Sequence, residues 1–160
     1  MQPRMIHVPA FAVAGLSVRT RNGDEANPAT ARIGALWDQF FSRSWARELP
    51  GPGADGRLYG VYSAYESNEQ GAFDVTAGVA AARAHPEVHT TQVDVHAGDY
   101  LVFRSEGAMP QMVMDGWSAV WRYFADHPAV RRRFSTDFEC YEGPDCVAIH
   151  IGIVRDAEPC

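Results

Sequence analysis

The order of strand and helix patterns in this chain repeats once along its length. Each half has a strand pattern, then an amphipathic helix pattern, then two further strand patterns. Matching segments lie roughly 80 residues apart, which is too long for a solenoid repeat and suits a duplicated half-domain. Because two such halves pack around an internal axis, we expect a groove between them. The segments are residues 8–16, 36–41, 59–62 and 73–76 in the first half, and residues 95–103, 120–124, 138–141 and 147–153 in the second.

The first repeat, residues 1–84, divides into a strand, a helix and a hairpin. Thr30 is a suitable N-cap, and the helix that follows it should end near Glu48, before a stretch rich in Pro and Gly. Apolar residues at helical spacing mark the buried face of this helix. The expected elements are a strand over 5–20, a loop over 21–29, a helix over 30–48 with its apolar stripe at Ile33, Leu36, Trp37, Phe40 and Phe41, and hairpin strands over 58–65 and 73–79.

The second repeat, residues 85–160, follows the same plan. Ala97-Gly98-Asp99 interrupts an apolar strand pattern and predicts a kink or bulge there. Pro110 suits the first turn of the helix. The expected elements are a strand over 88–106, a helix over 110–127 with its stripe at Val113, Trp117, Val120, Trp121 and Phe124, and a hairpin over 136–155.

These patterns predict an α+β fold. Two βαββ modules form one antiparallel sheet, with two helices and a ligand cleft between them. The 160 residues suit one ordinary domain, and the two repeats use all of them, so we expect no DNA-binding domain beside them.

Composition places the chain among globular proteins. It has 46% hydrophobic and 21% charged residues, a balance that is not typical of disorder. No apolar run approaches the ~20 residues that span a bilayer. The first five residues do not resemble a signal peptide. We therefore expect a cytoplasmic protein without a membrane partner.

The charge pattern excludes several functions. The net charge is −6, and the fourteen basic residues are all arginine. A Schiff-base lysine and a P-loop lysine are therefore excluded. Nucleic-acid binding needs a basic stripe, and the only basic cluster, Arg131-Arg132-Arg133, is expected to be a solvated turn after a helix. The net acidity leaves room for a cationic ligand.

Cysteine and histidine give no sign of a metal or cofactor. Cys140, Cys146 and Cys160 are too few for a disulfide framework, although the first two flank a turn and could face each other across a hairpin. We expect them to be reduced packing residues. The segment from His85 to His89 superficially resembles a zinc motif, but Pro86 breaks the helix that would bring the two imidazoles together.

Several motifs of this chain, taken in their order along the sequence, resemble those of the GyrI-like small-molecule-binding domain. This domain is also the effector-binding domain of AraC-type and MerR-type regulators. The resemblance covers nearly the whole chain. The motifs are Tyr59-Gly60-Val61-Tyr62-Ser63-Ala64-Tyr65-Glu66, Phe73-Asp74-Val75-Thr76-Ala77-Gly78, His96-Ala97-Gly98-Asp99-Tyr100 leading to Ser105-Glu106-Gly107, the helix with Trp117 and Trp121, Thr136-Asp137-Phe138-Glu139-Cys140-Tyr141, and Ile149-His150-Ile151-Gly152-Ile153.

The resemblance implies a cleft between the two helices, floored by strands of both repeats and lined with aromatic side chains. It also implies a buried acidic residue in the fifth strand, which Glu139 matches. Freestanding members of this family bind toxins or cationic compounds, or resemble gyrase inhibitors. A further subgroup resembles hydrolases that open strained cyclopropane rings with a glutamate helped by tryptophan.

Glu139 is the central candidate. Aligning the repeats places Gly60 at the position equivalent to Glu139, so the two halves of the cleft differ there. A carboxylate among aromatic rings should have a raised pKa and could pair with a cationic ligand or act as a general acid or base. If Glu139 instead faces solvent, it has no such role.

Aromatic residues complete the candidate site. Trp117 and Trp121 lie four residues apart, on one helix face, and one or both are expected to line the cleft. Tyr62, Tyr65 and Tyr141 are expected to offer hydroxyl groups to a ligand, whereas Trp37 is expected in the core.

Three functions remain open. The first is a freestanding receptor, monomeric or homodimeric, for amphipathic aromatic small molecules, including cationic ones. The second is a hydrolase of strained or electrophilic natural products, with Glu139, Trp117 and Trp121 as its catalytic residues. The third is a gyrase-inhibitor-like module that binds a protein.

Overall fold

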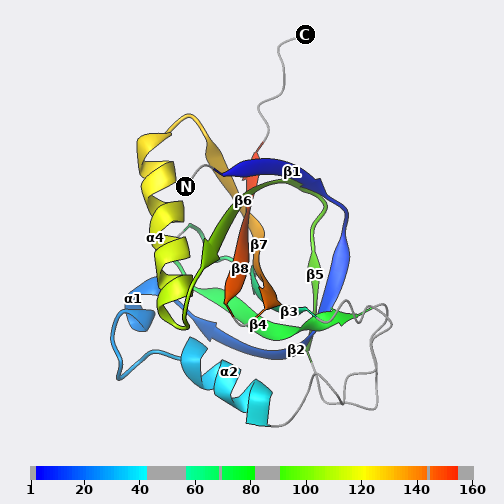
Figure 1. Cartoon of the computed structure of the whole chain (residues 1–160), viewed down its shortest axis with the longest axis vertical. Coiled ribbons are helices and arrows are strands. Elements are labelled where there is room, and N and C mark those ends of the chain that lie inside the picture. The colour runs from blue at the N-terminus through cyan, green and yellow to red at the C-terminus, as the bar shows by residue number, and fades with distance from the viewer. Residues whose placement is uncertain (1–2, 43–56, 69, 82–90, 144, 155–160) are drawn as a thin grey trace.

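The strands form one antiparallel sheet in the order β1-β6-β8-β7-β3-β4-β2-β5. The computed structural model describes residues 3–42, 57–68, 70–81, 91–143 and 145–154. Within these ranges, three helices accompany the sheet (Figure 1). The elements are β1 (Arg4–Val8), β2 (Phe11–Thr20), α1 (Asn22–Glu25), α2 (Ile33–Ser42), β3 (Leu58–Ser63), β4 (Phe73–Ala81), β5 (Thr91–Val95), β6 (Gly98–Glu106), α4 (Gln111–Asp126), β7 (Arg131–Gly143) and β8 (Cys146–Val154).

The predicted α+β fold and its duplication are confirmed. The first repeat contributes β2, α2, β3 and β4, and the second contributes β6, α4, β7 and β8. The six central strands read β6-β8-β7 and then β3-β4-β2, so the two repeats are related by an approximate two-fold axis. Gly60 pairs directly with Glu139 where β3 meets β7. The axis therefore passes through this residue pair.

Each of the two long strands predicted from the sequence is bent into two. A kink at Ala97–Asp99 was predicted, and β5 does end at Val95 before β6 begins at Gly98. The single strand predicted over 5–20 is wrong, because Pro9 and Ala10 separate β1 from β2. Proline cannot donate to a strand ladder, so a break there is physically reasonable.

The bends exchange strands between the repeats. β1 pairs with β6 of the second repeat, and β5 pairs with β2 of the first. The sheet consequently curls on itself, and β1 and β5 are its two edge strands (Figure 1).

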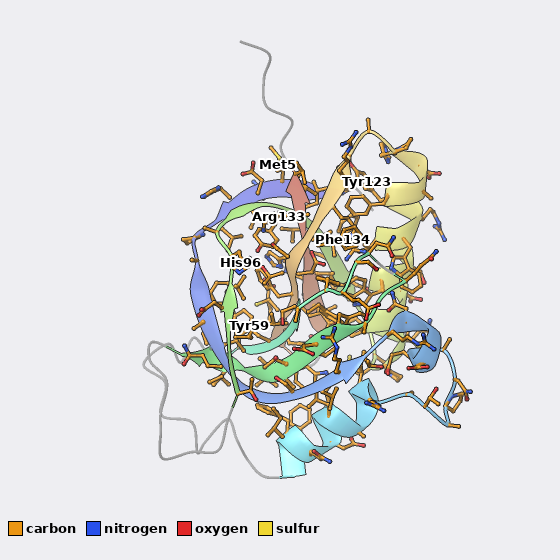
Figure 2. All side chains as sticks on the ribbon, turned by 180° about the vertical axis from the view of Figure 1, so that it is seen from behind. Met5, Tyr59, His96, Tyr123, Arg133 and Phe134 are labelled. Atoms are coloured by element: carbon orange, nitrogen blue, oxygen red, sulfur yellow. The ribbon has the colours of Figure 1, made fainter. Side chains whose placement is uncertain are left out.

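Packing differs on the two faces of the sheet. On one face, α2 packs on β2, β3 and β4, and α4 packs on β6 and β8, with Leu36 and Val120 among the residues buried beneath the helices. The other face carries a second cluster that includes Tyr59, Tyr100 and Phe138. In Figure 2, Tyr59 and Arg133 lie within the curl of the sheet. The side-chain alternation of the strands therefore separates an inner core from the helix-covered face.

The N-terminus of α2 differs from expectation. The helix begins at Ile33, so Thr30 is not its N-cap. A third, four-residue helix, α1, lies in the predicted loop and places Glu25 at this end of α2. The Glu25 carboxylate accepts hydrogen bonds from the N–H groups of Arg32 at 2.8 Å and Ile33 at 3.0 Å. A carboxylate at this position accepts hydrogen bonds from helix N–H groups that have no partner within the helix, and its negative charge interacts favourably with the positive end of the helix dipole.

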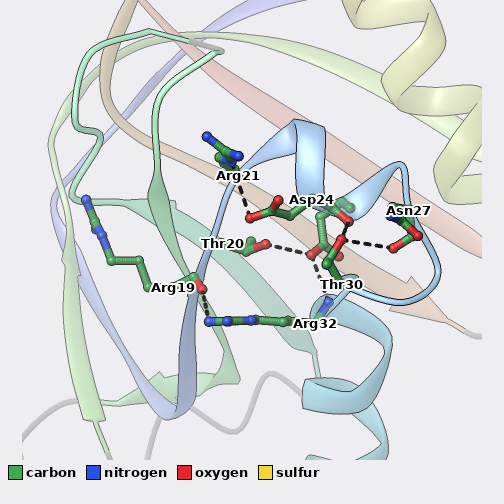
Figure 3. A network of polar contacts seen from close by, with 8 residues as sticks. Arg19, Thr20, Arg21, Asp24, Asn27, Thr30 and Arg32 are labelled. Carbon is green, nitrogen blue, oxygen red and sulfur yellow. Dashed lines mark hydrogen bonds and ion pairs between the residues drawn. The ribbon is translucent and has the colours of Figure 1, made fainter.

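Thr30 instead stabilises the turn after α1. Its hydroxyl donates to the carbonyl oxygen of Asp24 at 2.7 Å, as Figure 3 shows. Thr20 donates to Glu25 at 2.6 Å in the same network. The predicted end of the helix near Glu48 lies outside the described residues.

One smaller prediction is wrong, and one alternative that the sequence left open does not hold. Arg131-Arg132-Arg133 is not a solvated turn but the start of β7, and the Arg132 side chain is only 9% exposed. Cys140 pairs with Ala148 across the β7–β8 ladder, so it does not face Cys146. Neither of these two cysteines forms a disulfide bond within the described residues.

Other predictions fall on undescribed parts of the chain. These are the boundary between the repeats, the His85–His89 segment and Cys160. Of the helices in the described ranges, none is long and apolar enough to cross a membrane.

The sheet contains a close approach that only glycine allows. Gly15 and Gly78 face each other across the β2–β4 ladder, and a Cβ atom on Gly15 would run into the carbonyl oxygen of Ala77. Gly15→Ala should lower the free energy of unfolding by about 2 kcal/mol, because backbone atoms must move to accept the methyl group. Urea denaturation measures this change. Gly23→Ala is the matched control, since no atom lies within 4 Å of its added Cβ. Equal midpoints for the two variants would contradict the close approach.

Candidate functional site

Glu139 lies in the middle of the helix-covered face and is only 2% exposed. Its carboxylate accepts three hydrogen bonds from side chains of three elements. Trp117 of α4 donates its indole N–H to Oε2 at 2.6 Å, and Tyr62 of β3 donates its hydroxyl to the same oxygen at 2.8 Å. Tyr141, two residues along β7, donates to Oε1 at 2.9 Å. The carboxylate is therefore held in one orientation by three neutral donors.

Gly60 makes room for this carboxylate. A Cβ atom at position 60 would lie 2.7 Å from Oε1 of Glu139 and 3.2 Å from the Trp37 ring. Both distances are shorter than van der Waals contact. The predicted difference between Gly60 and Glu139 is thus a difference in charge and also in size, because the Glu139 carboxylate fits only if residue 60 has no side chain.

Around this pair, the approximate symmetry continues. Trp37 of α2 packs edge-on against Tyr141 at 5.4 Å between ring centroids, and Trp117 of α4 packs edge-on against Tyr62 at 5.1 Å. Trp37 was expected to lie in the core, but it is partly exposed and lines the same cavity as Trp117. Edge-to-face contacts of this kind fix ring orientation.

Burial raises the pKa of Glu139 above its ordinary value, and the three hydrogen bonds oppose this shift only in part. Removal of water disfavours the charged form of a carboxyl group, whereas donors favour it. Burial also raises the pKa of Tyr62 and Tyr141, and the charge of Glu139 adds to that effect. Both tyrosines therefore remain protonated donors.

A cavity of about 970 Å³ lies above Glu139. Residues of α2 and α4 form its two walls, and strands of both repeats form its floor. All six residues predicted from the sequence line it: Tyr62, Tyr65, Trp117, Trp121, Glu139 and Tyr141. Trp121 is 51% exposed and lies apart from the hydrogen bonds around Glu139. That these side chains contact a ligand stays a prediction.

A second carboxylate, Asp137, was not predicted as a site residue and is fully buried. It accepts hydrogen bonds from Arg132 at 2.8 Å, from the Tyr65 hydroxyl at 2.5 Å and from the N–H group of Gly152 at 2.8 Å. Tyr65 therefore binds Asp137 rather than Glu139. The signal was available, because Asp137, Glu139 and Tyr141 alternate along one strand and must share a face.

Arg132 also lines the cavity, but its charge is offset by Asp137. Glu139 is thus left without an arginine among its hydrogen-bond partners. Within the ranges that the structure describes, no three His, Cys, Asp or Glu side chains are grouped as metal ligands.

Several apolar residues of the cavity mouth were also missed as site residues. Phe41 of α2 is 60% exposed, and Met109 and Met114 beside or on α4 are 52% and 57% exposed. The spacing of Gly34, Trp37 and Phe41 on one helix face could have identified the α2 wall.

The raised pKa of Glu139 makes stability depend on pH in a defined direction. In the unfolded chain, Glu139 has a pKa of ~4.3. At pH values between this pKa and the raised pKa of the folded protein, the Glu139 carboxyl group is protonated only in the folded protein. Protonation of Glu139 therefore contributes its full stabilisation of the folded protein below the unfolded-state pKa. This contribution is lost as pH rises through the raised pKa of the folded state. Relative to the native protein, Glu139→Gln should gain stability with rising pH, by about 1.4 kcal/mol for each unit of pKa elevation.

Urea denaturation at several pH values between about 4 and 8 measures the difference between the two proteins. The control is Glu106→Gln, which removes an exposed carboxylate on β6 and should leave the difference flat. Parallel pH profiles for Glu139→Gln and the native protein would contradict the assignment.

Comparison with known proteins gives consistent results. The sequence model of a family described as integron-associated effector-binding protein, Cass2, matches residues 4–153. The crystal structure of an integron cassette protein, VCH_CASS2, from the mobile metagenome of Vibrio cholerae has a TM-score of 0.83. It is 38% identical to this chain over 96% of both chains. No curated protein matches the sequence.

Two more distant structures share the fold. SAV2435, solved with bound tetraphenylphosphonium, has a TM-score of 0.78 and 16% identity over 96% of this chain and 94% of its own. A bacterial transcription regulation protein from Staphylococcus aureus MU50 has a TM-score of 0.77 and 16% identity over 97% of this chain and 99% of its own. The resemblance to GyrI-like effector-binding domains is confirmed, and the chain belongs to the Cass2 family of integron-associated effector-binding proteins.

Proposed function

We propose that this protein binds amphipathic aromatic cations in the cavity between α2 and α4, with Glu139 as the counter-ion. The observation that carries the proposal is a buried carboxylate that is held by three neutral donors and, among the described residues, has no cationic hydrogen-bond partner. Burying such a group is unfavourable unless it is protonated or paired. A cationic ligand would supply the missing charge.

The walls of the cavity support the same ligand class. Trp37 and Trp117 flank the carboxylate, and their ring faces can attract a cation by about 0.5–2 kcal/mol. The exposed Phe41, Met114 and Trp121 offer a broad apolar mouth to the aromatic part of a ligand. SAV2435, which has the same fold, was solved with an aromatic phosphonium cation.

In this proposal, the two repeats act as one domain, since each supplies one wall of the cavity. All residues that line the cavity belong to one chain, so a monomer can form the whole cavity. A cytoplasmic location and the lack of direct nucleic-acid contact remain predictions.

Charge selectivity tests the proposal most directly. Tetraphenylphosphonium and tetraphenylborate have nearly the same shape and opposite charge, and quenching of tryptophan fluorescence can report binding of either. We expect the native protein to bind the phosphonium and not the borate. Glu139→Gln should weaken phosphonium binding by about 1–3 kcal/mol, because a charge-assisted contact is lost. Glu106→Gln, outside the cavity, should bind as the native protein does.

The same titration has a pH signature. Phosphonium binding should weaken as pH falls and Glu139 takes up a proton, with a midpoint above the ~4.3 of a free glutamate. Equal binding of both ions, or an unchanged preference in Glu139→Gln, would rule out Glu139 as the counter-ion.

We propose hydrolysis as a second candidate because Trp117 donates to Glu139 at 2.6 Å. A glutamate helped by tryptophan is what the resemblance to ring-opening hydrolases implies. Glu139 could then activate water or protonate a leaving group at a strained ring. Incubation with a cyclopropane-containing alkylating agent, followed by mass spectrometry, separates the two candidates. A receptor returns the compound unchanged, whereas a hydrolase yields a product heavier by one water molecule, and Glu139→Gln should abolish that product.

A further inference from the structure

The cavity contains a second carboxylate, Asp38, whose environment is unlike that of Glu139. Asp38 lies on α2, is exposed and lines the cavity wall. Within the part of the chain that the structure describes, its carboxylate has no hydrogen-bond or ion-pair partner. The other charged side chains that line the cavity are engaged: Glu25 with the N-terminus of α2, Arg132 with Asp137, and Glu139 with its three donors.

The approximate symmetry shows that Asp38 is a charge present in only one of the two repeats. Trp37 and Trp117 are equivalent in the two repeats, so the next residues, Asp38 and Ser118, are equivalent as well. Both line the cavity, from opposite walls. The repeats therefore differ in charge at two levels. At the floor, the second repeat has Glu139 where the first has Gly60, and on the walls the first repeat has Asp38 where the second has Ser118.

Exposed apolar side chains line the same cavity as Asp38. Phe41, one turn further along α2, is 60% exposed and stacks on Trp37 with an interplanar angle of 30°. Met114 and Trp121 on the α4 wall are 57% and 51% exposed. The outer part of the cavity thus offers aromatic and thioether surface together with one unpaired negative charge.

We propose that the cavity is built for dications, with one cationic group at Glu139 and the second at Asp38. The part of the ligand between them would lie along the aromatic and methionine side chains of the two walls. This inference rests on the proposed function for the Glu139 end and adds a second contact of a different kind. The Glu139 contact is buried, whereas the Asp38 contact is exposed to solvent and should be screened by salt.

The affinity of a dication that contacts both carboxylates should depend on the length of the spacer between its two cationic groups. Once one cationic group is bound, the second contact becomes intramolecular, and its strength depends on whether the linker spans the two carboxylates. A series of bis-quinolinium alkanes of increasing spacer length should therefore show an optimum. The matched monocations are N-alkylquinolinium ions with the same chains and no second head group.

Affinities for both series can be measured by isothermal titration calorimetry with the full chain. We expect the dication of optimal length to bind more tightly than its matched monocation. Asp38→Asn should weaken the dication roughly two- to fivefold, the size of an exposed ion pair, and weaken the matched monocation less. The advantage of the dication should shrink in high salt for the native protein and be nearly absent in Asp38→Asn.

Asp115→Asn is the matched control. Asp115 is an exposed carboxylate on α4 that does not line the cavity, so its removal changes the net charge equally without touching the site. If Asp38→Asn and Asp115→Asn weaken the dication equally, the effect is one of net charge and the inference is wrong. It is also wrong if matched mono- and dications bind equally well.

The outcome separates this inference from the proposed function. Monocation binding that depends on Glu139 but shows no gain from a second charge keeps the proposed function and overturns only the dication site. Failure of every cation to bind overturns both. A dication preference that depends on Asp38 but not on Glu139 overturns both the proposed counter-ion and the two-carboxylate dication site.

Discussion

A carboxylate buried without a cation is the constraint around which this protein is arranged. Glu139 can remain in the interior because an indole N–H group and two phenolic hydroxyl groups donate to it and because burial favours its protonated form. Each donor must be held in place by its own surroundings. The helix α4 positions Trp117, and the β3–β7 ladder positions both tyrosines.

The two repeats give the cavity walls that are similar in backbone and in aromatic residues. The charged side chains of the cavity differ between the repeats. Trp37 and Trp117, and Tyr62 and Tyr141, occupy equivalent places and make equivalent ring contacts. Charge differs at the floor and on the walls of this symmetrical frame. A ligand that enters therefore meets two halves that match in surface but differ in electrostatics, which favours one binding orientation over its reverse.

Much of this arrangement follows from local pattern. The helix over Gln111–Asp126, the β3–β4 and β7–β8 hairpins and the equivalence of Gly60 and Glu139 were predictable because periodicity and repetition are local properties. The cap of α2 was not, since Glu25 reaches it from a separate helix rather than from the position just before it. The pairing of Arg132 with Asp137 was missed because a bulge between them in β7 turns the arginine inward. Long-range contacts of this kind leave no periodic signal in the sequence.

The pairing of Gly60 with Glu139 on the symmetry axis explains why this cavity needs two halves of different sequence. In a homodimer of identical half-domains, the two residues on the axis would have to be the same. Two glycines would leave the floor uncharged, and two glutamates would place a Cβ atom where the opposing carboxylate lies, 2.7 Å from its oxygen. Only halves that differ in sequence can place a single carboxylate on the axis. A difference in sequence between the halves is what allows a symmetrical frame to hold an odd number of charges at its centre, and one chain keeps the two different halves together.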